Sequence, residues 1–135
     1  MENCRFCSLI KGEGQVHKVF EDDQCLVFMD KHPINPGHVL VIPKTHVADF
    51  YDMEETIYSH VFLVVKKLSQ VIKNIYSPDK VGLVLAGYDV AHAHIHIIPM
   101  HHPDDITSRS YEGGARSNPS EEELADEAGK ISKSV

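Results

Sequence analysis

The apolar residues of the chain follow two periods, one typical of a helix and one typical of strands. Between Asp52 and Pro78, apolar residues recur every three or four positions, which predicts one long helix with a wide apolar face. Asp52 and Glu55 have the spacing of a capping pair at its start, and Pro78 predicts its end. Short helices are expected over residues 4–11 and, weakly apolar, from Ser120 onward.

Short apolar runs bounded by turn residues predict five β-strands. The predicted strands are residues 16–20, 25–30, 38–43, 81–87 and 91–99. The connections within the first three, and a tight turn at Tyr88 and Asp89 between the last two, suit hairpins and therefore antiparallel pairing. The predicted fold class is α+β: a five-stranded antiparallel sheet, one long helix packed on it, and short N- and C-terminal helices.

The chain divides into a main domain, residues 1–103, and a polar loop with a C-terminal helix or tail, residues 104–135. The 135 residues are enough to bury a core without disulfide bonds. After Pro103, the glycine-containing run "SRSYEGGARSNP" predicts a mobile loop. No run of eighteen apolar residues is present, so no membrane-spanning segment is expected.

The composition limits the classes of partner and the compartment. A net charge of −7 argues against duplex nucleic acid and anionic membranes as partners, because both require a basic surface. Three cysteines, an odd number, fit a reducing compartment better than a disulfide framework. Because the N-terminus also lacks a basic leader with an apolar run, a cytoplasmic location is expected. The unusual feature is the ten histidines.

Three of these histidines occupy alternate positions in "AHAHIHIIP", residues 91–99. Alternate strand positions share a face, so His92, His94 and His96 are expected together on one side. Burying three imidazoles is costly unless each has a partner. The pattern is compatible with a metal site, with nucleophilic catalysis at phosphorus, or with a solvated strand face that is rich in histidine.

Three motifs resemble those of the histidine triad family of nucleotide-binding proteins and nucleotide hydrolases. "HAHIHII" resembles the triad signature, "CLVFMDKHPINPGHVLVIPKTH" (residues 25–46) resembles the family's second block, and "CRFC" with "KGE" resembles its N-terminal block. Together they cover residues 4–102 in the family's order and spacing. The resemblance implies a histidine triad catalytic domain over residues 1–103, and commonly a homodimer.

The resemblance also implies an activity and the residues that carry it. The expected enzyme is a hydrolase acting at the α-phosphate of purine nucleotide conjugates, either nucleoside phosphoramidates or dinucleoside polyphosphates. His94 is expected to attack phosphorus and form a nucleotidyl–histidine intermediate, and His96 to bind phosphate and assist the leaving group. Asp30 is expected to accept hydrogen bonds from the ribose. The expected nucleotide-binding residues are Asp30, Phe6, Leu9, Phe28, Asp89 and His96, of which the apolar three form the base slot.

Cys4 and Cys7 form a C-x-x-C pair, which alone fits a redox pair, half of a metal site, or two small buried side chains. Zinc-binding members of the family complete the pair with two histidines. The resemblance therefore implies a structural zinc ion bound by Cys4, Cys7, His46 and His92, with no open coordination position.

One segment departs from the family pattern. Many members have Gly-Gln-Ser/Thr before the triad, whereas "GYDVAH" places Tyr88 at the Gln position and Asp89 at the hydroxyl position. A carboxylate beside a phosphate repels it unless the side chain turns away or orients a histidine. Two alternatives therefore stay open: a nucleotide-binding regulatory or adaptor protein with little turnover, and a metal-dependent hydrolase whose triad binds the metal. Of the remaining histidines, His38 is expected to be structural, His17, His32 and His60 to lie on the surface, and His101 and His102 in a solvated loop.

Overall fold

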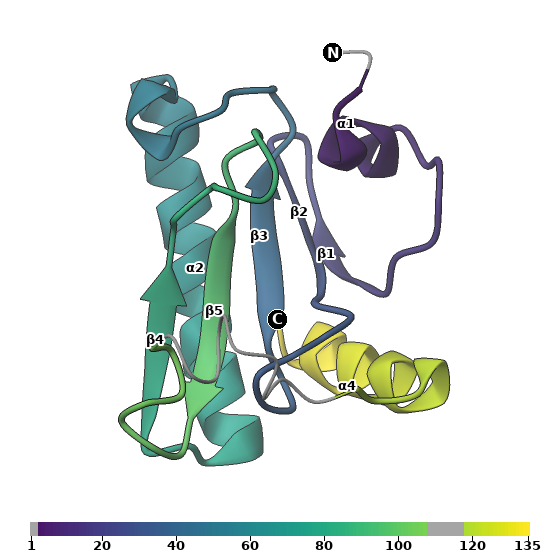
Figure 1. The fold of residues 1–135 in the computed structure, drawn as a ribbon, viewed down its shortest axis with the longest axis vertical. Helices are drawn as coiled ribbons and strands as arrows, with labels where there is room; N and C mark the ends of the chain where they lie inside the picture. The colour runs from purple at the N-terminus through teal and green to yellow at the C-terminus, as the bar shows by residue number, and fades with distance from the viewer. Residues whose placement is uncertain (1–2, 108–117) are drawn as a thin grey trace.

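A five-stranded antiparallel sheet with helices on both faces forms the fold of the computed structural model (Figure 1), which describes residues 3–107 and 118–135. The elements are α1 (Arg5–Ile10), β1 (Lys18–Glu21), β2 (Cys25–Met29), β3 (Val39–Pro43), the 3-10 helix η1 (Phe50–Asp52), α2 (Glu55–Tyr76), β4 (Lys80–Val84), β5 (Ile95–Met100) and α4 (Glu121–Ser134). The strand order is β1-β2-β3-β5-β4, and every neighbouring pair is antiparallel. The predicted α+β class is confirmed.

Each face of the sheet is buried by a different helix, because alternate strand residues point to opposite sides. On one face, Val27 of β2 and Val41 of β3 belong to the main core, which α2 and α4 cover. On the other face, Phe28 and Leu40 belong to a smaller core that Phe6 of α1 completes. In Figure 1, α1 and α4 lie near opposite ends of the sheet. Residues of the smaller core also line one side of the candidate site.

The long helix begins differently from the prediction but ends, as predicted, just before Pro78. Asp52 closes η1 and does not cap α2; the N-cap is Glu54, whose side chain makes no capping hydrogen bond. The prediction was wrong because η1 turns the chain before the helix starts. The helix stops at Tyr76, and Ser77 adopts a left-handed conformation with φ of 50°. Pro78 accounts for this end, since a residue before proline disfavours the helical region.

The fifth strand is shorter than predicted. It begins at Ile95, and residues 85–94 form a long connection from β4 where a two-residue turn was expected. The prediction failed because pairing stops early on both sides of β5. Val41 of β3 pairs with Ile95 and Val84 of β4 pairs with His96, and neither strand pairs with the residues before Ile95. The first two triad histidines therefore precede the strand, and the segment is held partly by the Ala93 N–H, which donates to the Val47 carbonyl at 2.7 Å.

The C-terminal helix is part of the main core. Ser120 and Glu123 form the predicted capping box, and the helix that they start is 14 residues long. Leu124, Ala128 and Ile131 are buried against β1, β2 and α2, which gives this segment more apolar contact than its composition indicated. The predicted mobile loop falls mostly at residues 108–117, outside the described residues. Within the described ranges, no helix is long and apolar enough to cross a membrane.

Candidate active site

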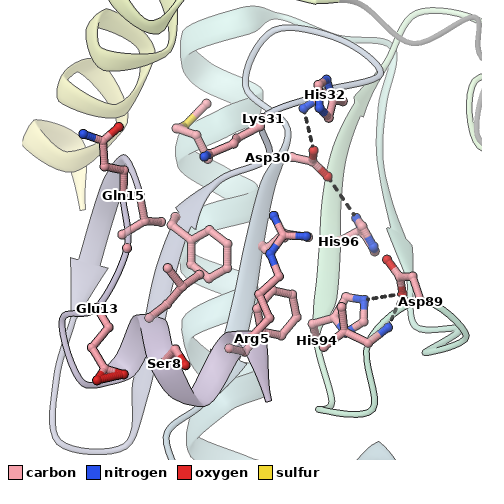
Figure 2. Close-up of a pocket in the computed structure, with 18 residues that line it drawn as sticks. Arg5, Ser8, Glu13, Gln15, Asp30, Lys31, His32, Asp89, His94 and His96 are labelled. Carbon is pink, nitrogen blue, oxygen red and sulfur yellow. Dashed lines mark hydrogen bonds and ion pairs between the residues drawn. The ribbon is translucent and has the colours of Figure 1, made fainter. Parts of the chain in front are cut away.

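A pocket of about 550 Å³ opens between α1, the end of β2 and the segment that leads into β5 (Figure 2). Its wall contains every residue that the sequence assigned to catalysis or nucleotide binding: Phe6, Leu9, Phe28, Asp30, Asp89, His94 and His96. These residues come from three separate parts of the chain, so the fold brings together what the motifs only suggested.

The three triad imidazoles are buried, and each has a hydrogen-bond partner. His92, His94 and His96 are at most 3% exposed. The Nδ1–H of His94 donates to the His92 carbonyl at 2.7 Å, which leaves the lone pair of Nε2 for the pocket. The ring of Phe6 packs against the His94 ring edge to face, with centroids 5.1 Å apart. His94 is thus held in one tautomer and one orientation, as a nucleophile requires.

A second imidazole, His38, orients His96. The Ile34 N–H donates to His38 Nδ1 at 3.1 Å, so the proton of neutral His38 is on Nε2. That nitrogen lies 2.9 Å from His96 Nδ1, which must therefore accept. The proton of neutral His96 is then on its own Nε2. This chain of bonds gives His96 an N–H donor where neutral His94 has a lone pair. These are the complementary roles of a hydrogen-bond donor to the leaving group and of a nucleophile.

Asp30 lies between the end of β2 and the two linked imidazoles. One carboxylate oxygen accepts the His32 N–H at 2.8 Å, and the other lies 3.4 Å from His38 Nε2 and 3.7 Å from His96 Nδ1. The side chain is 12% exposed and lines the pocket. Asp30 thus supports the charge of the imidazole pair as well as facing the space assigned to the ligand, and its ribose role stays a prediction.

Asp89 contacts the candidate nucleophile directly. Its Oδ1 lies 3.2 Å from His94 Nε2 and also accepts the Val90 N–H at 3.0 Å. The side chain is 67% exposed, on the connection between β4 and β5. The sequence raised two possibilities for this carboxylate, turning away or facing a histidine, and the structure has the second. A substrate phosphorus that approaches Nε2 must displace it.

Cys4, Cys7, His46 and His92 form a second cluster, behind the pocket, with ligand atoms all within 4.8 Å of one another. Cys7 Sγ lies 3.2 Å from His46 Nδ1 and 3.6 Å from His92 Nδ1, and Cys4 Sγ lies 3.3 Å from His92 Nδ1. His92 donates through Nε2 to the Pro43 carbonyl at 2.8 Å, so its Nδ1 presents a lone pair to the sulfurs. This is the tautomer that a metal-binding imidazole adopts when its other nitrogen is fixed by a carbonyl.

Electrostatics within this cluster also suit a cation. Burial lowers the pKa of His92, which keeps the imidazole neutral and able to bind a metal. Burial and the neighbouring Cys4 raise the pKa of the Cys7 thiol, because two thiolates side by side repel each other. A bound divalent cation would offset the repulsion between the two thiolates and so favour their deprotonated forms. Two thiols and two imidazoles are a tetrahedral donor set with no place for a substrate.

Sequence reasoning missed the part that His38 plays and the cations of the pocket. His38 was assigned to structure alone, although its place in the "GHVLVIPKTH" block, shared with His46, was a usable signal. Arg5 and Lys31 also line the pocket, and no motif drew attention to them. The other histidines lie outside it except His32, which is exposed at its rim. His17 and His60 are half-buried and pair with Glu121 and Asp22, whereas His101 and His102 are exposed.

The comparisons with known proteins identify the family. The HIT domain family model matches residues 11–103, so the chain belongs to the histidine triad family. It is 36% identical to the adenosine 5'-monophosphoramidase HNT1 of Candida albicans, over 72% of this chain and 70% of that protein. It is 34% identical to the adenylylsulfatase HINT3 of Arabidopsis thaliana, over 72% of this chain and 52% of that protein.

A solved structure supports the fold over the whole chain. The crystal structure of a Hit-like protein involved in cell-cycle regulation from Bartonella henselae superposes with a TM-score of 0.83 at 30% identity. The match covers 100% of this chain and 98% of that one. The predicted family and the predicted architecture are both confirmed.

Proposed function

We propose that the protein is a hydrolase of purine nucleotide conjugates that cleaves the bond between the α-phosphorus and its leaving group. The observation that carries the proposal is the opposite state of two neighbouring imidazoles. Once Asp89 is displaced, neutral His94 presents a lone pair on Nε2, and neutral His96 presents a proton, in one pocket. Two relatives are named for such activities, an adenosine 5'-monophosphoramidase and an adenylylsulfatase. The purine base is assigned to the slot formed by Phe6, Leu9 and Phe28, and the ribose to Asp30.

The reaction runs in two displacements. His94 Nε2 attacks the α-phosphorus, and the bond to the leaving group breaks. The leaving atom keeps the electron pair, accepts a hydrogen bond from the His96 Nε2–H, and takes a proton from solvent where the leaving group is basic. Water then attacks the nucleotidyl–His94 intermediate and loses its proton to solvent. The bond from phosphorus to Nε2 breaks, and the nucleoside monophosphate leaves. His38 keeps the His96 proton on the correct nitrogen throughout both steps.

A structural zinc ion belongs to the proposal. Cys4, Cys7, His46 and His92 have the donor atoms, the spacing and the His92 tautomer to hold it. When bound, the ion supplies cross-linking between α1 and the segment that carries His94, and it takes no part in bond breaking. The same assignment argues against the metal-dependent alternative, because His92 faces the cysteines and His94 faces the pocket.

The competing proposal is a nucleotide-binding regulatory protein with little turnover. The observation in its favour is the Asp89 carboxylate 3.2 Å from His94 Nε2, where phosphorus must arrive. Both proposals expect nucleoside monophosphate to stabilise the fold, since a ligand that binds only the native state raises the melting temperature. Only the hydrolase proposal expects turnover.

Release of AMP from adenosine 5'-phosphoramidate, adenosine 5'-phosphosulfate and diadenosine triphosphate tests the proposal. Wild-type protein should release AMP from at least one of them, and His94→Ala should lose activity by at least about a thousandfold. AMP-dependent stabilisation without release from any of these compounds would favour the regulatory protein. We also propose a cytoplasmic homodimer, for which sedimentation of the purified chain and fractionation of cells are the tests.

A further inference from the structure

Asp89 is an acidic residue that lies against the proposed nucleophile, with its Oδ1 3.2 Å from His94 Nε2 (Figure 2). We infer that Asp89 determines the charge of the leaving group that the site accepts, favouring amines over anionic groups such as sulfate or a phosphate chain. The inference rests on the proposed function and adds to it a residue that sets substrate specificity.

Geometry keeps Asp89 close to the leaving group even after the substrate has displaced it. The carboxylate has room to turn aside, because its side chain is 67% exposed and a second hollow of about 500 Å³, which it also lines, adjoins the pocket. In-line displacement puts the leaving atom on the order of 5 Å from His94 Nε2. Asp89 Oδ1 starts 3.2 Å from Nε2, so before it turns aside it lies within about 8 Å of such a leaving atom, one Debye length, where salt does not screen their interaction fully. After it turns aside, the side chain remains on the segment that leads to His94.

The charge of Asp89 is not outweighed by its surroundings. The pocket is lined by three carboxylates, Glu13, Asp30 and Asp89, and by two cationic side chains, Arg5 and Lys31. Figure 2 shows Glu13 at the far side of the pocket and Asp89 beside His94. A polyanionic conjugate therefore meets no excess of positive charge here, and the carboxylate nearest to the reacting bond belongs to Asp89.

The negative charge of Asp89 affects the departure of an amine and the departure of an anion in opposite ways. When a phosphoramidate reacts, the bond from Nε2 to phosphorus forms, the P–N bond breaks, and nitrogen keeps the electron pair, accepts a hydrogen bond from His96 Nε2–H and takes a proton from solvent. The free amine then gains a proton from solvent, and the resulting ammonium group is attracted to Asp89. Sulfate or a phosphate chain leaves with increased negative charge, which Asp89 repels as the charge develops.

The test compares kcat/KM for AMP release from adenosine 5'-phosphoramidate with that from adenosine 5'-phosphosulfate, in three proteins. Wild type should prefer the phosphoramidate. Asp89→Asn, which keeps the shape and removes the charge, should raise relative activity on the phosphosulfate by about ten- to a hundredfold. Glu13→Gln removes a charge from the same pocket far from His94, and its preference should stay within about threefold of wild type.

The outcomes separate this inference from the proposed function. If wild type is active and Asp89→Asn changes both substrates by the same factor, the inference is overturned and the hydrolase stands. A shift as large in Glu13→Gln would also overturn it, since the effect would then be one of net pocket charge. If wild type releases no AMP from either compound, this inference falls, and the hydrolase falls with it only if diadenosine triphosphate is not cleaved either. Because Asp89 is exposed, the variant should keep the wild-type melting temperature, which confirms that the comparison is made on folded protein.

Discussion

His38 Nε2 lies 2.9 Å from His96 Nδ1, so a histidine 58 residues earlier in the chain sets the proton of the third triad imidazole. His38 is fully buried and has no contact with the surrounding water. Its other ring nitrogen is fixed by the Ile34 N–H at 3.1 Å. A backbone turn thus determines the tautomer of His38, and His38 determines that of His96.

Replacing His38 should therefore slow the chemical step. His38→Leu removes the donor to His96 Nδ1, and we expect kcat to fall by about a hundredfold with a smaller change in KM. His38→Gln retains an N–H in a similar position and should recover part of the loss. The comparison is made on proteins whose circular dichroism matches wild type. Full activity in folded His38→Leu would contradict the positioning role.

The cysteine and histidine cluster predicts one zinc ion per chain in metal analysis. Cys7→Ser should lose the metal and destabilise the fold by about 3 kcal/mol, roughly ten degrees in melting temperature. Cys25→Ala is the matched control. Burial raises the pKa of Cys25 to about 12, and this thiol belongs to a separate group with Asp22 and His60. Retention of zinc by Cys7→Ser, or its loss from Cys25→Ala, would place the metal elsewhere.

The base slot can be tested on two neighbouring residues of α1. Leu9 and Ile10 are both half-buried and both pack on the smaller core, but only Leu9 lines the pocket. Leu9→Ala should raise the KM for a purine substrate by about tenfold, since it removes up to 2 kcal/mol of apolar contact, and should leave kcat near wild type. Ile10→Ala should change stability but not KM. Equal effects of the two substitutions on KM would argue against a base slot at Leu9.

Stability should fall in acid partly because of Asp105, which is 7% exposed. Burial opposes its ionisation, yet the N–H groups of His101 and His102 and the Asn35 amide hold the pKa of this carboxyl below its ordinary value of 3.8. A carboxyl with a lowered native pKa stabilises the fold above its unfolded pKa, and that contribution is lost as pH falls through the native value.

Asp105→Asn should accordingly be less stable than wild type at pH 7, by about 1–3 kcal/mol, because it loses charge-assisted hydrogen bonds. The difference should shrink between about pH 4 and pH 2, since only wild type loses the contribution there. Urea unfolding at a series of pH values measures it. A constant difference across this range would show that the Asp105 charge does not stabilise the turn at residues 101–105.

The sequence predicted the sheet, the long helix and the membership of the pocket because each depends on local periodicity or on a contiguous motif. Phe6, Asp30 and His94 were found through motifs, and the fold brings them to one pocket. The long connection before Ile95 could not be predicted, because the end of a strand depends on where its partners stop pairing. The bond from His38 to His96 was likewise outside its reach, since it joins side chains 58 residues apart in the chain. For Asp89 the sequence left two possibilities open, and only the folded connection shows that the carboxylate faces His94.

The central claim is that His94 Nε2 attacks the α-phosphorus and carries the nucleotidyl group between the two displacements. The most direct measurement is intact-protein and peptide mass spectrometry after rapid quenching of the protein with adenosine 5'-phosphoramidate. We predict an adenylyl adduct on His94 that is absent from His94→Ala. Turnover with the adduct on another residue, or undiminished AMP release by His94→Ala, would contradict the account.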